Sequence, residues 1–207
     1  MKLYFTRHGK TEWNQDRRFQ GMEGDSPLLK ESYIEIEQLG MHLKDISFEK
    51  IHSSPLSRTR KTAEGIRNEL KVKPEIVFSD DLRELGLGDL EGQKIDLGKQ
   101  LYPTQMRAMR DSPSEYDPSP FNGETFEEML ERSVPFVREK IAEATEGPLL
   151  FVSHGMTLGG IIQTLVGTPL KDLRKDGGLA NNSLSVIDYT DGVFTLELWD
   201  DVSFLEK

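Results

Sequence analysis

Two short stretches of the sequence share one pattern, and together they constrain the fold more than any other feature. Residues 2–6 contain aromatic and β-branched residues typical of a buried strand, and Arg7-His8-Gly9 follows them. Residues 148–153 are a second short apolar run, followed by His154-Gly155. In open α/β sheets, ligands bind outside the carboxyl ends of parallel strands, where residues distant in sequence meet. The repeated pattern therefore predicts that both histidines belong to one site.

The rest of the chain alternates between strand-like and helix-like patterns, as expected for an α/β fold. Further strands are predicted at 49–53 and 75–79, and a hairpin at the sheet edge is predicted at 184–189 and 193–199. Helices are predicted at 29–46, from Ser54 to about residue 70, at 93–110 with an interruption at Pro103, at 125–144 and at 157–166.

Local signals set the expected ends and faces of these helices. Ser54 and Pro55 suit the N-cap and first position of a helix, which places Arg58 in its first turn. Thr125 and Glu128 form a capping-box pattern. The apolar faces predicted to be buried consist of Tyr33, Ile36, Gly40 and Leu43 in one helix and of Ala63, Ile66 and Leu70 in the next.

Three stretches without a sustained period are expected to be loops. Residues 10–27 form a long polar loop, and residues 81–92 form a structured loop with glycines among acidic residues. Residues 94–123 are interpreted as an insertion or lid over the site, of which the part from 111 to 123 is rich in turns and expected to be exposed. We expect one domain covering residues 1–207.

Charge and composition narrow the classes of function. The formal net charge is -10, which disfavours non-specific electrostatic binding to nucleic acid or to an anionic membrane. No apolar run is long enough for a membrane span, and no signal-peptide core follows Lys2, so a cytoplasmic protein is expected. The chain has no cysteine. An anionic substrate must then be held by a local cluster of cations.

Several sequence blocks in order resemble the signature of the histidine phosphatase superfamily, the phosphoglycerate mutase-like group. The resemblance extends over nearly the whole chain and implies a three-layer α/β/α fold with a mixed, mostly parallel sheet. The blocks that carry it are Arg7-His8-Gly9 with Thr11, Trp13 and Asn14, residues 18–21, Ser54 to Arg58 with Thr62-Ala63, Leu82-Arg83-Glu84, and Ser153-His154-Gly155.

The resemblance assigns roles that suit phosphate-ester chemistry. His8 would attack phosphorus as a neutral imidazole, its second ring nitrogen donating to a backbone carbonyl. Arg7 and Arg58 offer planar forks for bidentate contact with phosphate. His154 would hold another equatorial oxygen, and by resemblance Glu84 is the general acid and base. The residues expected to contact substrate are Asn14, Gln20, Gly21 and Gly155.

Plainer interpretations exist for some of these residues. Glu84 lies among acidic residues that could form a solvated loop, and Asp81 is the first alternative for the acid. His42 and His52 are expected to be structural. Because the four histidines form no pair at helical spacing beside clustered acids, a zinc site is disfavoured, and neither metal nor cofactor is expected.

Three functions fit the resemblance. The first is a phosphatase on small phosphorylated metabolites, because residues 86–92, and residues 20–21 with 25–28, look like the small phosphatase branch. A cofactor-dependent phosphoglycerate mutase is the alternative, but those enzymes carry paired arginines in a larger insertion, whereas Arg107 and Arg110 are separated here. A non-catalytic binder of phosphorylated ligands is the third. Ser32 replaces a glycine common in relatives, and the chain is expected to be a monomer or homodimer.

Overall fold

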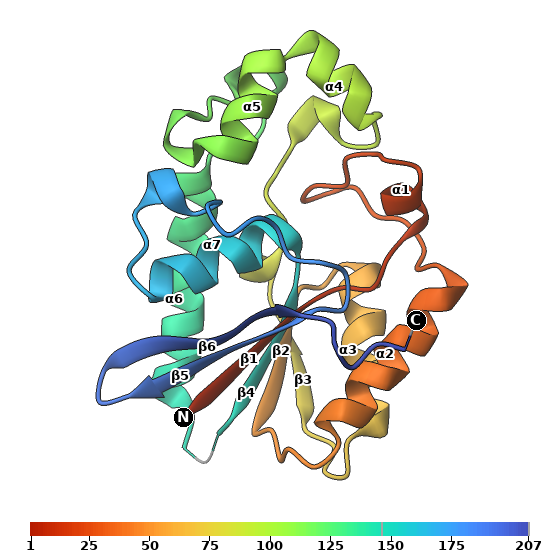
Figure 1. The fold of residues 1–207 in the computed structure, drawn as a ribbon, viewed down its shortest axis with the longest axis vertical. Helices are drawn as coiled ribbons and strands as arrows, with labels where there is room; N and C mark the ends of the chain where they lie inside the picture. The colour runs from red at the N-terminus through yellow and green to blue at the C-terminus, as the bar shows by residue number, and fades with distance from the viewer. Residues whose placement is uncertain (146, 207) are drawn as a thin grey trace.

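A mixed six-stranded sheet forms the centre of the computed structural model, which describes residues 1–145 and 147–206 (Figure 1). The strand order is β3-β2-β4-β1-β5-β6. The first four of these pair in parallel, β5 is antiparallel to β1, and β6 is antiparallel to β5. This confirms the expected mixed, mostly parallel sheet. The strands are β1 (Lys2–Arg7), β2 (Lys50–Ser53), β3 (Glu75–Phe78), β4 (Leu149–Ser153), β5 (Leu184–Thr190) and β6 (Val193–Asp201).

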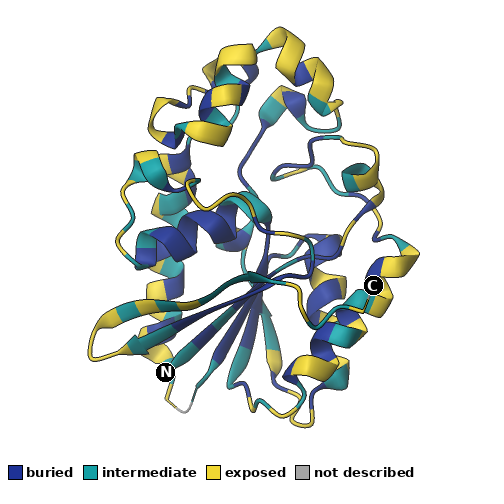
Figure 2. Cartoon of the chain, viewed as in Figure 1, coloured by how far each residue is buried: buried dark blue, intermediate teal, exposed yellow. Residues whose placement is uncertain are grey.

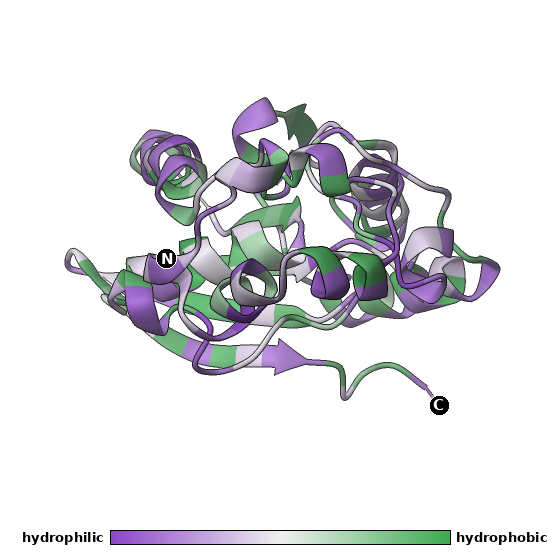
Figure 3. Ribbon diagram, turned by 90° about the horizontal axis from the view of Figure 1, so that it is seen from above, coloured by the Kyte–Doolittle hydropathy of each residue, from purple (hydrophilic) through white to green (hydrophobic). Residues whose placement is uncertain are grey.

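Helices cover both faces of this sheet, which gives the three layers. On one face, α2 (Lys30–Leu43) and α3 (Ser57–Glu69) pack on Leu150 and Val152 of β4. On the other, α6 (Phe126–Glu143) and α7 (Gly155–Leu165) pack on Leu149 and Phe151 of the same strand. Because successive strand residues point to opposite faces, one strand serves both cores. Hydrophobic segments accordingly gather between the layers (Figure 3), and the inner strands are buried (Figure 2).

The predicted lid lies above the carboxyl edge of the sheet (Figure 1). It contains α4 (Ile95–Leu101) and α5 (Pro103–Asp111), which meet at Pro103 as predicted. The expectation that residues 111–123 are exposed was wrong in part, because Tyr116 and Phe121 are buried in a third hydrophobic cluster. The remaining short elements are α1 (Glu12–Gln15) and the 3-10 turns η1 (Asp80–Leu82), η2 (Gly88–Leu90), η3 (Pro113–Glu115), η4 (Ser119–Phe121) and η5 (Leu170–Asp172).

Most local signals in the sequence are confirmed. Thr125 and Glu128 form the predicted capping box of α6. The β5–β6 hairpin turns at Asp191 and Gly192, whose φ values of 53° and 81° match a turn that requires a left-handed backbone at both positions. Among the predicted structural histidines, His52 is buried and stacks on Phe151 with ring centroids 5.3 Å apart.

Three local expectations were wrong. Helix α3 begins at Ser57 with Leu56 as its N-cap, so Ser54 does not cap it. Tyr33 is 47% exposed, because α2 turns its Ile36 and Leu39 side towards the sheet instead. Helix α7 begins at Gly155, two residues earlier than predicted. Within the residues described, no helix has the length and apolar character needed to cross a membrane.

Candidate active site

The sheet register brings the two predicted histidines to one edge. Arg7 lies opposite Ser153 in the β1–β4 pair, and Ser53 lies opposite Val152 in the β2–β4 pair. His8 and His154 therefore follow neighbouring strand ends. Their ring centroids are 5.2 Å apart, with the rings inclined at 62°. The topology thus confirms that the two His-Gly units meet.

The orientation of the His8 ring fixes which nitrogen can act as a nucleophile. Its Nδ1 lies 2.8 Å from the carbonyl oxygen of Gly9, an atom that can only accept, so Nδ1 carries the proton. The lone pair is then on Nε2. Burial, with Arg58 and Arg7 nearby, holds the pKa of His8 well below its usual value, which keeps the ring neutral.

His154 is fully buried, and its ring is held by two side chains. Nδ1 accepts a hydrogen bond from Arg58 Nε at 3.3 Å, and Nε2 lies 2.8 Å from the hydroxyl of Ser54. Its pKa is also well below the usual value, because of burial and then of the charge of Arg58. The Ser54 side chain, which sequence analysis placed at a helix cap, is therefore part of the site. As the side chains lie, both ring nitrogens have partners, so His154 would have to give up one of these bonds before it could donate to a phosphate oxygen.

The two predicted arginines differ in what they can offer a ligand. Arg58 makes four hydrogen bonds, to His154, to the carbonyls of Gly21 and Gly24 and to Asp25. A guanidinium has five N–H donors, so Arg58 has one to spare and acts chiefly as a fixed positive charge.

Arg7 has more free donors. Its Nη1 donates to the carbonyl of Leu179 at 2.7 Å, while its buried Nε has no hydrogen-bond partner. Nε and Nη2 form one side of the guanidinium, which suits two parallel bonds to one phosphate. The bidentate contact expected of both arginines is thus available from Arg7 and not from Arg58 as its bonds stand.

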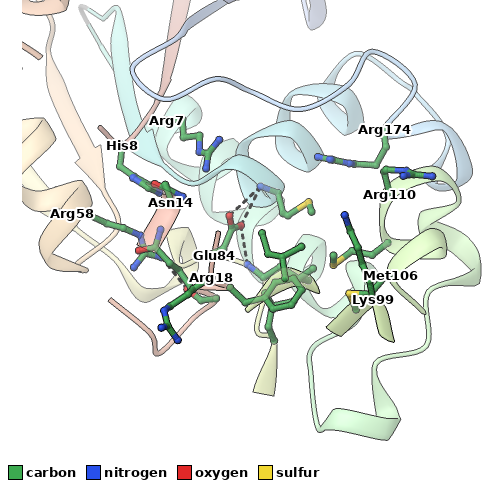
Figure 4. A pocket seen from close by; sticks show the side chains of 18 residues that line it. Arg7, His8, Asn14, Arg18, Arg58, Glu84, Lys99, Met106, Arg110 and Arg174 are labelled. Atoms are coloured by element: carbon green, nitrogen blue, oxygen red, sulfur yellow. Dashed lines mark hydrogen bonds between the residues drawn. The ribbon is translucent and has the colours of Figure 1, made fainter. Parts of the chain in front are cut away.

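The Glu84 carboxylate is held at the N-terminus of α7. Its Oε1 accepts from the backbone N–H groups of Leu85 and Thr157 at 3.0 and 3.1 Å, and Met156 N lies 3.2 Å from both oxygens. The Thr157 hydroxyl donates to the carbonyl of Arg83 at 2.7 Å, and its oxygen lies 3.2 Å from Oε1. Oε2 is therefore the freer oxygen, and the side chain points into the cavity (Figure 4). By contrast, Asp81 accepts from Ser79 and does not line this cavity.

Three of the four predicted substrate contacts line the same cavity. Asn14 Oδ1 accepts from the backbone N–H of Thr11, which turns its amide nitrogen away from that bond and leaves it as a donor. Gln20 and Gly21 also line the cavity. The fourth, Gly155, does not appear among the lining residues. It lies behind Arg7, and a Cβ there would be 3.4 Å from Arg7 Nε.

The cavity itself has a volume of about 340 Å³ and extends from the histidine end to the lid (Figure 4). Arg174 and the lid residues Lys99 and Met106 also line the cavity, and none of them was predicted as a site residue. Arg174 lies in an irregular segment after η5 that carries no motif, so no sequence signal could have found it. Within the described ranges no group of three or more His, Cys, Asp or Glu side chains is arranged to hold a metal ion.

Comparisons with known proteins match this chain to one family and to solved structures of the same fold. The family model for the histidine phosphatase superfamily (branch 1) matches residues 3–202. A probable phosphoglycerate mutase GpmB of Shigella boydii is 33% identical over 213 residues, covering 100% of this chain and 95% of that protein. The solved structure of Bacillus stearothermophilus YhfR matches with a TM-score of 0.91 and 31% identity, covering 99% of both chains. An alpha-ribazole phosphatase from Shigella flexneri matches with a TM-score of 0.82 and 25% identity, covering 97% of this chain and 96% of that one.

Proposed function

The chain belongs to the histidine phosphatase superfamily, branch 1, a superfamily of phosphoryl-transfer enzymes, and from this premise we propose that it is a phosphatase of small phosphomonoesters. The main support for the proposal is the orientation of the His8 ring. Its Nδ1–H is bound to Gly9, so the Nε2 lone pair is available in a cavity beside two guanidinium groups. A neutral imidazole beside fixed positive charge is what attack on an anionic phosphate requires.

In the first step, His8 Nε2 bonds to phosphorus while the bond from phosphorus to the ester oxygen breaks. The proton on Glu84 Oε2 passes to the departing oxygen, which leaves as an alcohol. Arg7 binds two phosphoryl oxygens, and the fixed charge of Arg58 stabilises the charge that develops on the phosphoryl group. The amide nitrogen of Asn14 donates to the same group.

In the second step, water attacks the phosphorus of the phosphohistidine. Glu84, now a carboxylate, takes a proton from that water, and the nitrogen–phosphorus bond breaks to release phosphate and restore His8. His154 contributes through Arg58, because its Nδ1 accepts the Arg58 Nε–H and so helps to hold the guanidinium in place. No metal or cofactor takes part in this scheme.

The alternative is phosphoglycerate mutase activity, which the similarity to the probable mutase GpmB favours. The lid supports the phosphatase. Arg107 does not line the cavity, and Arg110 is held by both oxygens of Asp111 at 2.7 Å. No pair of lid arginines is therefore free to clamp phosphoglycerate in the part of the chain that the structure describes.

The test is hydrolysis of phosphate esters in EDTA, with p-nitrophenyl phosphate and a panel of sugar and glycerate phosphates. We expect release of inorganic phosphate, an acid-labile phosphoryl group on the quenched enzyme, and loss of both in a folded His8→Ala variant. Hydrolysis retained by His8→Ala would exclude the mechanism.

The same panel separates the alternatives. Conversion of 3-phosphoglycerate that depends on 2,3-bisphosphoglycerate, with little phosphate released, would identify a mutase. Tight binding of phosphate esters without turnover by the native chain would identify a non-catalytic binder.

A further inference from the structure

The cavity holds more positive charge than phosphoryl transfer needs. The chain has a net charge of -10, yet one acidic side chain, Glu84, lines the cavity beside six basic ones. The basic residues are Arg7, Arg18, Arg58, Lys99, Arg110 and Arg174. Arg7 and Arg58 serve the transferred phosphate in the proposed function, so four cations remain to be explained.

Two of these four are already neutralised. Arg18 Nε lies 3.1 Å from a carboxylate oxygen of Asp16, and its Nη1 donates to the carbonyl of Gly92. Arg110 is paired with Asp111 through two hydrogen bonds of 2.7 Å, and it extends away from the reactive cluster in Figure 4. Both guanidinium groups are therefore already paired with a carboxylate of the chain.

Arg174 and Lys99 differ from them. The buried Nε of Arg174 has no hydrogen-bond partner, although the charges of Glu84 and Asp111 lie near this guanidinium. Lys99 is exposed, and no carboxylate among the described residues lies within salt-bridge distance of either side chain. In Figure 4 the Arg174 guanidinium extends towards the reactive cluster, while Lys99 rises from α4 on the lid side. Since buried donors in folded proteins are almost always satisfied, an unpartnered Nε–H of an arginine that lines a cavity indicates an anionic ligand group.

The wall between the two charged ends is apolar. Met106 and Met109 of α5, Met156 of α7, and Leu85 and Leu87 all contribute to it. Methionine side chains are flexible and adapt to ligands of different shape. This wall suits a carbon body better than a polyhydroxylated one.

We propose that the preferred substrates are elongated phosphomonoesters with an apolar carbon body and a second anionic group at the far end, bound by Arg174 and Lys99. The second group is a carboxylate or a second phosphate, since a guanidinium and an ammonium together recognise either. The inference rests on the proposed function, because it assumes that the transferred phosphate lies between His8 and Arg7. It identifies Arg174 and Lys99 as specificity-determining residues.

The test uses phosphonates, which bind without being hydrolysed. Calorimetry would compare three ligands at each of several chain lengths: an alkylphosphonate, the matching phosphonate with a terminal carboxylate, and the matching bisphosphonate. The variants are Arg174→Gln and Lys99→Gln. Lys175→Gln is the matched control, because it removes the same charge from the next residue, which is exposed and does not line the cavity.

We expect the two ligands with a second anion to bind roughly tenfold or more tightly than the alkylphosphonate of the same length, as for a hydrogen bond to a charged group. Arg174→Gln should remove most of this preference, Lys99→Gln part of it, and Lys175→Gln none. The tighter of the two charged ligands identifies the second group. The inference would be overturned if the ligands with a second anion bound no more tightly than the alkylphosphonate. It would also be overturned if Arg174→Gln and Lys99→Gln both left the preference unchanged.

Turnover separates this result from the proposed function. If the charged phosphonates are preferred but the matching phosphate esters are not hydrolysed, the phosphatase proposal fails and the second anion site stands. If the esters are hydrolysed without a preference for the second anion, the phosphatase stands and the second anion site fails.

Discussion

At the scale of single residues, the chemistry depends on the protonation of His8. Its ring is 2% exposed, and its pKa is lowered by burial and by the charges of Arg58 and Arg7. The neutral ring is the nucleophile, so activity is present above this pKa and is lost as the pH falls through it. A lowered pKa therefore extends activity to more acidic pH than an ordinary imidazole, with a pKa of about 6.5, would allow.

We expect the His8 ring to titrate well below pH 6.5, as measured by nitrogen NMR of the histidine side chains with a His8→Asn variant to assign the signal. The acid limb of kcat/KM should follow the same titration once the ionisation of the substrate is allowed for. A His8 signal that titrates at or above pH 6.5 would contradict the electrostatic argument.

Glu84 permits a second prediction at this scale. Glu84→Gln keeps the size of the side chain but cannot deliver the proton. With alkyl phosphates, whose leaving groups need protonation, we expect a loss in kcat of about 10²- to 10⁴-fold. With p-nitrophenyl phosphate, whose leaving group is stable as an anion, the loss in the first step should be much smaller.

Pre-steady-state release of nitrophenol measures that first step directly. Asp81→Asn is the matched control, since Asp81 bonds Ser79 outside the cavity and should change neither rate. Equal losses on both kinds of ester in Glu84→Gln would move the acid role to another residue.

At the scale of secondary-structure elements and loops, Glu91 connects two loops to the site. Its carboxylate accepts from the consecutive backbone N–H groups of Met22, Glu23 and Gly24 at 2.6 to 2.9 Å, and from Leu87 at 3.0 Å. The same loop supplies the carbonyls of Gly21 and Gly24 that hold Arg58. Glu91 thus positions Arg58 without lining the cavity itself.

We expect Glu91→Gln to lower kcat/KM by about 10- to 100-fold, because an amide replaces one acceptor oxygen with a donor and lets the Arg58 loop move. Asp89→Asn on the neighbouring turn is the control, since Asp89 is exposed and bonds only the Asn122 side chain. Phosphate affinity should fall together with the rate. A folded Glu91→Gln chain as active as its parent would show that Arg58 does not depend on this loop.

At the scale of the whole molecule, the lid and the body share one hydrophobic cluster. Phe121 in the lid is fully buried with its ring centroid 5.1 Å from that of Tyr102, and the cluster includes Phe126 and Met129 of α6. Since α6 also packs on the central sheet, this helix joins the cluster in the lid to the main core. Residues 1–207 are therefore expected to unfold as one unit.

We expect Phe121→Ala to lower the free energy of unfolding by about 3 to 5 kcal/mol, the usual cost of removing a buried aromatic ring. Urea unfolding followed by far-UV circular dichroism and by tryptophan fluorescence should show one shared transition at lower denaturant. Leu101→Ala, also in the lid but 58% exposed, should change little. Two separate transitions in the Phe121→Ala variant would mean that the lid folds independently.

Local patterns in the sequence indicate the class of fold and the edge of the sheet at which the reactive residues meet. Strand periodicity, capping signals and the two His-Gly units are local properties, and the rule that ligands meet the carboxyl ends of parallel strands converts them into a shared site. That His8, Arg58 and His154 share one site could therefore be predicted from neighbouring residues along the chain, whereas Glu84 and the roles of these residues were implied by the resemblance to the family.

Which donors are free, and which other residues line the cavity, depends on tertiary contacts. Arg58 is occupied because the loop at Gly21 and Gly24 folds onto it, and Ser54 bonds His154 instead of capping a helix. Arg174 reaches the cavity from a segment without a pattern of its own. These properties depend on contacts between residues far apart in the chain, and no local pattern of charge or hydrophobicity encodes such contacts.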